Sequence, residues 1–161
     1  MDTKSFRVET DDYVFRRPET EEENIAYENF FLSQFRDNPR YRIFDTPDAA
    51  VELSLTSGRA FEMLHGVRYG VYDKKADMRL CAAYRLVPPE VGHHDYPDEL
   101  QAEPAFKKIT SMNDNIEARA RRDHPEYFAE GTRMMRTNGL CVDRDYRGRG
   151  LLLAMTDVVD A

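Results

Sequence analysis

The chain has 161 residues, of which 41% are hydrophobic, and its 30 acidic against 23 basic side chains give a formal charge of −7. This length is enough for one domain with its own core and too short for two, so we expect a single domain over residues 1–161. The acidic balance opposes non-specific binding to nucleic acid or to an anionic membrane surface, so neither is expected as a partner.

The apolar runs and the cysteine spacing limit the expected location of the protein and the kinds of site it could hold. No apolar run approaches the roughly 20 residues that a membrane span needs, and the N-terminal stretch has no signal-peptide core, so a cytoplasmic location is the default expectation. The two cysteines, Cys81 and Cys141, lie in different predicted strands and form no CxxC pair. Neither a disulfide framework nor a metal knuckle is therefore predicted.

The first third of the chain predicts one strand and two helices. Residues 13–16 (YVFR) have the composition of a strand. Thr20 followed by Glu23 is a capping-box pattern, and it precedes a helix predicted over residues 20–36. The apolar face of this helix consists of Tyr27, Phe30, Phe31 and Phe35. A second helix is predicted over residues 46–64, with a proline at its first helical position.

The middle and last thirds predict a hairpin, a loop, a long helix and a final strand. Residues 67–72 and 79–87 are rich in strand formers, and the polar DKKAD between them has the length of a hairpin connection. Prolines and a glycine predict a loop over residues 88–100. Apolar side chains at steps of three and four predict a helix over residues 104–122. Residues 132–142 read as a strand, with Gly139 marking a bulge.

Two polar clusters are interpreted as solvated surface. His93, His94 and Asp95 lie side by side in the predicted loop, where adjacent side chains diverge and no third ligand has a recognisable spacing, so no metal site is predicted. The long helix carries a basic side made of Lys107, Lys108, Arg119, Arg121 and Arg122. A solvated face is the favoured interpretation of this side, and a specific anion site is the alternative.

The stretch DYRGRG, residues 145–150, lies between the last strand and an apolar run that predicts a helix starting near Gly150 or Leu151. The first amides of such a helix have no partners within the helix and point at whatever binds there. Glycines at 148 and 150 let an anion approach the backbone, and Arg147 and Arg149 add donors. This composition suits a pyrophosphate group, although it is neither a Walker loop nor a dinucleotide-binding fingerprint.

Two other interpretations of this stretch compete. An isolated R-G-R-G is commonly a basic turn that binds no ligand. Nucleic-acid contact of the RGG type is the second, but such segments occur in repeated, disordered tracts, whereas this one occurs once between strand and helix patterns. The context therefore favours anion binding.

The segment LCVDRDYRGRGLLLAM resembles the acyl-CoA-binding signature of the GNAT N-acetyltransferases, whose core is Q/R-x-x-G-x-G/A. Arg147 and Gly150 match its first two fixed positions, and Leu152 departs from the last. The resemblance implies acetyl-CoA as cosubstrate. The backbone of Cys141 and Val142 would bond the pantetheine arm, and the pyrophosphate would lie on the amides of Arg147, Gly148, Arg149, Gly150, Leu151 and Leu152.

A looser resemblance extends to the insect-type arylalkylamine (dopamine) N-acetyltransferases. It rests on ELSLTSGRAF before the hairpin and on the long amphipathic helix FKKITSMNDNIEARARRDHPEYF after it. In that branch a glutamate just before a proline is the usual general base. Here Asn38 takes that place and cannot accept a proton, so Asp37 beside it is the candidate catalytic base.

These observations give an expected fold and function. The fold class is α/β (α+β by some schemes), a mixed, mainly antiparallel sheet flanked by helices, as in the GNAT fold without its C-terminal part. The chain would then be a fragment, or complete its fold with another chain, or be inactive. An exposed sheet edge, with apolar residues such as Leu153 and Val158, would offer a route to self-association. The expected function is acetyl transfer from acetyl-CoA to a primary amine, such as an arylalkylamine, without a metal; the alternative is a non-catalytic remnant that binds CoA or a partner.

Overall fold

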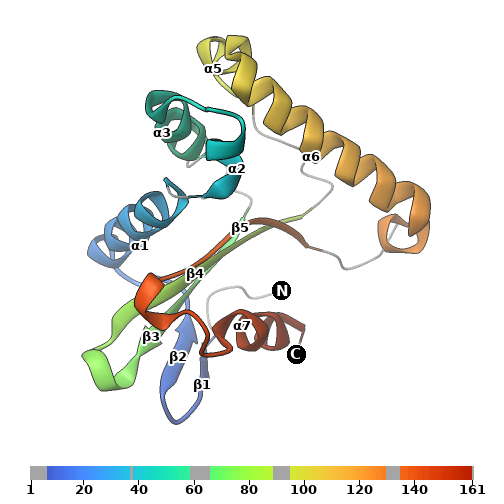
Figure 1. Ribbon diagram of the computed structural model, residues 1–161. Helices are drawn as coiled ribbons and strands as arrows, with labels where there is room; N and C mark the ends of the chain where they lie inside the picture. The colour runs from blue at the N-terminus through green and yellow to red at the C-terminus, as the bar shows by residue number, and fades with distance from the viewer. Residues whose placement is uncertain (1–6, 37, 59–65, 89–94, 130–134, 161) are drawn as a thin grey trace. The chain divides into compact units, whose positions relative to one another are not determined.

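A computed structural model describes residues 7–36, 38–58, 66–88, 95–129 and 135–160. The described residues form a five-stranded antiparallel sheet and six α-helices, an α+β arrangement (Figure 1). They pack as two compact units, each described by itself. The first takes its residues from 1–35, 66–87 and 137–161, and the second from 36–65 and 88–136. The single domain remains a prediction.

The first unit is built on the sheet, whose strand order β1-β2-β3-β4-β5 follows the chain. Its strands are β1 (Arg7–Glu9), β2 (Tyr13–Arg16), β3 (Val67–Asp73), β4 (Arg79–Val87) and β5 (Arg136–Val142). The predicted hairpin is confirmed as β3 and β4, with Val67 opposite Leu86 and an irregularity between Val71 and Tyr72. The strand β1 was not predicted, because three residues are too few to show an alternating pattern.

Helix α1 (Glu21–Phe35) supplies the aromatic part of this unit's core. The predicted cap is confirmed, because the amide of Glu23 donates to Thr20 Oγ1 at 3.1 Å. Of the predicted apolar face, Tyr27, Phe31 and Phe35 are buried and Phe30 is half-buried. The Tyr27 hydroxyl donates to the carbonyl of Tyr84 on β4 at 3.0 Å, so this buried helix face is tied to the sheet.

Gly139 in β5 was expected to mark a bulge, which stays a prediction, and its surroundings give it a packing role. A β-carbon at this position would lie 2.3 Å from Cζ of Phe31, closer than any real contact. Glycine is therefore required where α1 approaches β5.

The second unit is helical. Its helices are α2 (Pro39–Ile43), α3 (Asp48–Ser57), α5 (Asp98–Ala102) and α6 (Pro104–Asp123). Helix α3 covers the first part of the predicted 46–64 helix and ends at Ser57, with Gly58 as its C-cap. Residues 59–64 lie outside the described residues. Helix α5 begins within the last residues of the stretch predicted as a loop, 88–100, and continues to Ala102. The loop prediction was wrong from Asp98 onward, because five residues are too short for a periodic pattern.

Helix α6 has the predicted extent, and its apolar face is only partly buried. Phe106 and Ile109 are buried, Met112 and Ala120 are half-buried, and Ile116 is 62% exposed. The periodicity of the sequence located the helix correctly but did not show where along its length burial stops.

Candidate functional site

The turn between β5 and the last helix has the predicted strand–turn–helix path. Strand β5 ends at Val142, a short 3₁₀ turn runs over Arg144–Tyr146, and helix α7 spans Leu151–Asp160. Asp143 caps the 3₁₀ turn, since its carboxylate accepts from the amide of Asp145 at 2.9 Å. The helix thus begins at one of the two positions that the sequence predicted.

The first amides of α7 have no backbone acceptor among the described residues. The first backbone bond into the helix runs from the amide of Ala154 to the carbonyl of Gly150 at 3.1 Å. The amides of Leu151, Leu152 and Leu153 therefore have no acceptor within the helix. The positive end of the helix dipole adds to their attraction for an anion.

Both glycines of the turn have a left-handed backbone and open surroundings. Their φ angles are +78° at Gly148 and +76° at Gly150, and apart from its chain neighbours a β-carbon at either would meet no atom of the described residues within 4 Å. Glycine is needed here for the backbone angle, because L side chains rarely adopt it. Each glycine also leaves the turn accessible from outside.

The two arginines of the turn are exposed, and each guanidinium group donates a hydrogen bond to a nearby backbone carbonyl. Arg147 Nε donates to the carbonyl of Val142 at 3.2 Å. Arg149 Nη2 donates to the carbonyl of Asp145 at 3.0 Å, and its guanidinium lies 4.5 Å from the centre of the Tyr146 ring. Both cations thus stay beside the turn.

The other residues predicted to contact acetyl-CoA differ in how accessible they are to a ligand. Cys141 is buried, which raises the pKa of its thiol to about 12, so the thiol stays protonated at neutral pH. The carbonyl of Val142 already accepts from Arg147 and would have to share its second lone pair with a ligand. Leu151 is buried, whereas Leu152 is 48% exposed.

Contacts that the sequence did not reveal fasten this turn to the β3–β4 hairpin. The buried Tyr146 hydroxyl donates to Asp73 Oδ2 at 2.8 Å, which lowers the pKa of Asp73 and raises that of Tyr146. Arg79 at the start of β4 pairs with Asp143 at 2.9 Å. The amide of Asp143 also donates to the carbonyl of Cys81 at 2.9 Å. These partners are 62 or more residues apart, so no local pattern could link them.

The candidate general base is not placed by the structure. Asp37 lies outside the described residues. The Asn38 side chain accepts from the amide of Arg40 at 3.0 Å and so caps helix α2. Asn38 therefore has a structural role that requires no proton transfer.

A second polar cluster that the sequence did not reveal lies inside the first unit. Glu28 on α1 accepts from Arg68 of β3 at 3.0 Å and from Arg85 of β4 at 2.5 Å. The side chains of Glu28 and Arg85 are 8% and 3% exposed, and the Arg85 guanidinium lies 3.7 Å from the centre of the Phe31 ring. Each carboxylate oxygen is thus occupied by a guanidinium, an arrangement that stabilises packing and leaves no free oxygen to act as a base.

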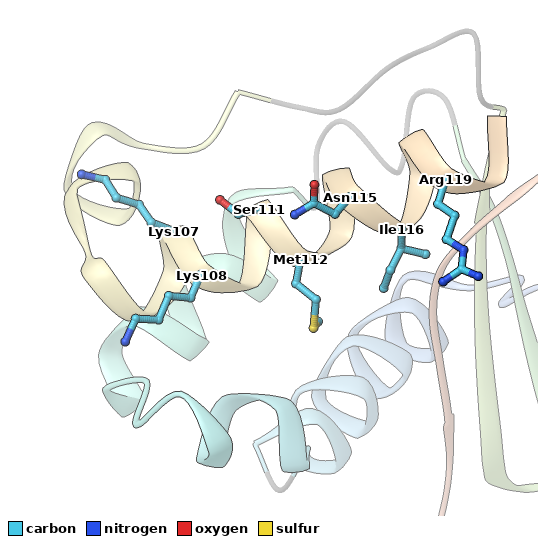
Figure 2. A pocket seen from close by; sticks show the side chains of 7 residues that line it. All are labelled: Lys107, Lys108, Ser111, Met112, Asn115, Ile116 and Arg119. Carbon is cyan, nitrogen blue, oxygen red and sulfur yellow. The ribbon is translucent and has the colours of Figure 1, made fainter. Parts of the chain in front are cut away.

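The basic side of α6 was the other candidate anion site. A shallow depression of about 640 Å³ is lined by Lys107, Lys108, Ser111, Met112, Asn115, Ile116 and Arg119. Figure 2 shows that Lys108, Met112, Ile116 and Arg119 point to the same side of the helix, while Lys107 points away. Arg119 is paired with Asp123 at 3.2 Å, and Arg121 with Glu117 at 2.6 Å. The cations are therefore spread along one helix and partly neutralised, as on a solvated face.

The described residues contain neither a metal-binding cluster nor a membrane-spanning helix. In that part of the chain, no group of three or more His, Cys, Asp or Glu side chains could hold a metal ion. His93 and His94 fall outside it. None of the described helices combines the length and the apolar character of a membrane-spanning segment.

Comparisons with known proteins give no relative for this chain: no family model, no curated protein and no solved structure matches it. The fold and the site therefore define it only as an α+β protein with an open, arginine-flanked turn at the start of its last helix.

Proposed function

We propose that this chain binds the diphosphate of acetyl-CoA at the turn 147–152 and transfers the acetyl group to a primary amine, such as an arylalkylamine. One observation carries the proposal: the amides of Leu151, Leu152 and Leu153 have no backbone acceptor in the described part of the chain, and two accessible glycines and the exposed Arg147 and Arg149 lie just before them. Anions bind such helix starts through the amides and the helix dipole. The resemblance of this segment to the GNAT signature supports the same ligand.

Direct transfer is the mechanism we favour. The amine nitrogen attacks the thioester carbonyl, the carbon–sulfur bond breaks, the CoA thiolate takes a proton, and the new amide loses one. A covalent acetyl-cysteine is disfavoured, because burial raises the pKa of the thiols of Cys81 and Cys141 to about 12. An alkylamine with a pKa of about 10.4 is less than about one part in a thousand neutral at pH 7, so a base would accelerate the reaction by roughly 10²–10⁴-fold. Asp37 is the proposed base.

Calorimetric titration with CoA and acetyl-CoA tests the cofactor site. We expect Arg147→Gln to weaken binding, because it removes a cation beside the diphosphate. Arg144→Gln is the matched control, since Arg144 is an exposed arginine three residues earlier in the 3₁₀ turn. An absence of heat and of thermal stabilisation at millimolar CoA with the unaltered chain would refute the proposal.

A non-catalytic CoA-binding remnant is the second candidate function. It is favoured by Asn38, which occupies the position of the usual glutamate and caps a helix. An acetylation assay with tyramine, dopamine and a polyamine separates the two functions. Turnover that falls in Asp37→Asn supports the enzyme, whereas CoA binding without turnover of any amine supports the remnant.

A further inference from the structure

We propose that Asp73 and Tyr146 are positioning residues that hold the turn 147–152 in its ligand-binding shape. This inference rests on the proposed function, because it concerns the turn that would receive the diphosphate. Neither residue is expected to contact the ligand: both are buried, and Asp73 lies at the end of β3, far along the chain from the turn.

The Asp73 carboxylate joins two turns of the molecule. Its Oδ1 accepts from the amide of Lys75 at 2.8 Å and caps the 3₁₀ turn between β3 and β4. Its Oδ2 accepts from the Tyr146 hydroxyl at 2.8 Å. A charged acceptor with both oxygens occupied fixes the position of each donor more firmly than a neutral one.

Tyr146 is well placed to transmit this restraint. It is 5% exposed, and the residues that follow it, Arg147 to Gly150, are all exposed. Its ring also carries the guanidinium of Arg149 at 4.5 Å. The hydroxyl bond therefore sets where the ring lies, and the ring sets where the turn and one of its cations lie.

Separate measurements with the diphosphate part and the pantetheine part of CoA distinguish a positioning role from a general loss of stability. A misplaced turn would weaken the contact with a diphosphate but not contacts with the backbone of β5, whereas a loss of fold would weaken both. Tyr146→Phe removes the hydroxyl and keeps the ring, and Asp73→Asn keeps a side chain that can bond both the Lys75 amide and the Tyr146 hydroxyl. Tyr127→Phe is the matched control, because Tyr127 is 54% exposed and lies outside the turn.

The experiment is a titration of these variants with inorganic pyrophosphate and with pantetheine, followed by amide resonances and by hydrogen exchange of residues 148–153. We expect Tyr146→Phe to weaken pyrophosphate binding roughly tenfold, as loss of a bond to a charged group suggests, with pantetheine binding unchanged and faster exchange in the turn. Asp73→Asn should retain most of the affinity, because its amide group can still bond both the Lys75 amide and the Tyr146 hydroxyl, and Tyr127→Phe should match the unaltered chain.

Unchanged pyrophosphate binding and unchanged turn exchange in Tyr146→Phe would overturn the inference, as would an equal loss of both ligands. If Tyr146→Phe does not fold, Asp73→Asn and Asp73→Ala decide the matter, because only the second should loosen the turn. If the unaltered chain binds neither pyrophosphate nor CoA, the proposed function fails, and turn exchange alone then tests the positioning.

Discussion

The buried ion pairs of Glu28 give the sharpest stability prediction. Glu28→Gln keeps the shape of the side chain and one acceptor oxygen, and it replaces the other oxygen with an amide group that faces a guanidinium. The guanidinium groups of Arg68 and Arg85, whose side chains are 14% and 3% exposed, would then lose the negative charge of Glu28 in a buried environment. Breaking a buried pair in this way costs about 3–5 kcal/mol of unfolding free energy. At about 2–4 °C per kcal/mol, the melting temperature should fall by roughly 6–20 °C.

Urea and thermal unfolding followed by circular dichroism measure this loss, since the chain has no tryptophan to serve as a fluorescent probe. Glu52→Gln is the matched control: its pair with Arg36 has the same 3.0 Å separation as the pair of Glu28 with Arg68, but its side chains are 57% and 60% exposed. An exposed pair contributes about 0.2–1 kcal/mol. If Glu28→Gln cost no more than Glu52→Gln, the description of Glu28 as a desolvated, doubly paired carboxylate would be wrong.

Three further predictions concern single sites. Gly139→Ala should lower the free energy of unfolding in urea by about 1–3 kcal/mol, because its β-carbon would overlap the ring of Phe31. Phe31→Leu in the same chain should recover part of this loss. If the losses of the two single variants simply add in the double variant, the overlap is not the cause. Gly150→Ala should cost about 1–2 kcal/mol in thermal unfolding from its φ of +76° alone, and Gly150→Asn less; equal losses would refute a conformational cause. Arg16 lowers the pKa of Glu23 from 4.5 to about 2, so this carboxylate stabilises the fold above pH 4.5 and loses that effect as the pH falls towards 2. Unfolding of Glu23→Gln over this range should depend less on pH, and an unchanged slope would contradict the assignment.

Local sequence patterns predicted the elements whose caps, apolar periodicity or turn residues are close together in the sequence. Helix α1, the β3–β4 hairpin and helix α6 were recognised because caps, periodicity and turn composition act within a few residues of each other. The short helix α2 was not predicted, although Pro39 stands at its start and Asn38 caps it. A proline that follows a helix can equally end one element or open another, and only the chain path decides.

The candidate site was predictable in part for the same reason. The glycines and arginines of residues 147–150 are neighbours in the sequence, so their joint chemistry could be inferred. The partners that hold the turn are not neighbours: Asp73 and Tyr146 are 73 residues apart. Tyr146 is part of DYRGRG and Asp73 ends a predicted strand, but nothing in either segment indicates the other.

The chain leaves the first unit twice, through residues 36–65 and 88–136, and returns each time to the same sheet. The contacts that close this unit therefore span long separations: 57 residues for Glu28 with Arg85 and 64 for Arg79 with Asp143. Bringing such distant residues together reduces the conformational entropy of the chain before the contacts between them form, and topologies of this kind fold slowly. The hairpin β3–β4 can form early from local contacts, whereas the turn at residues 147–152 can acquire its shape only after β5 has docked, so we expect it to form late.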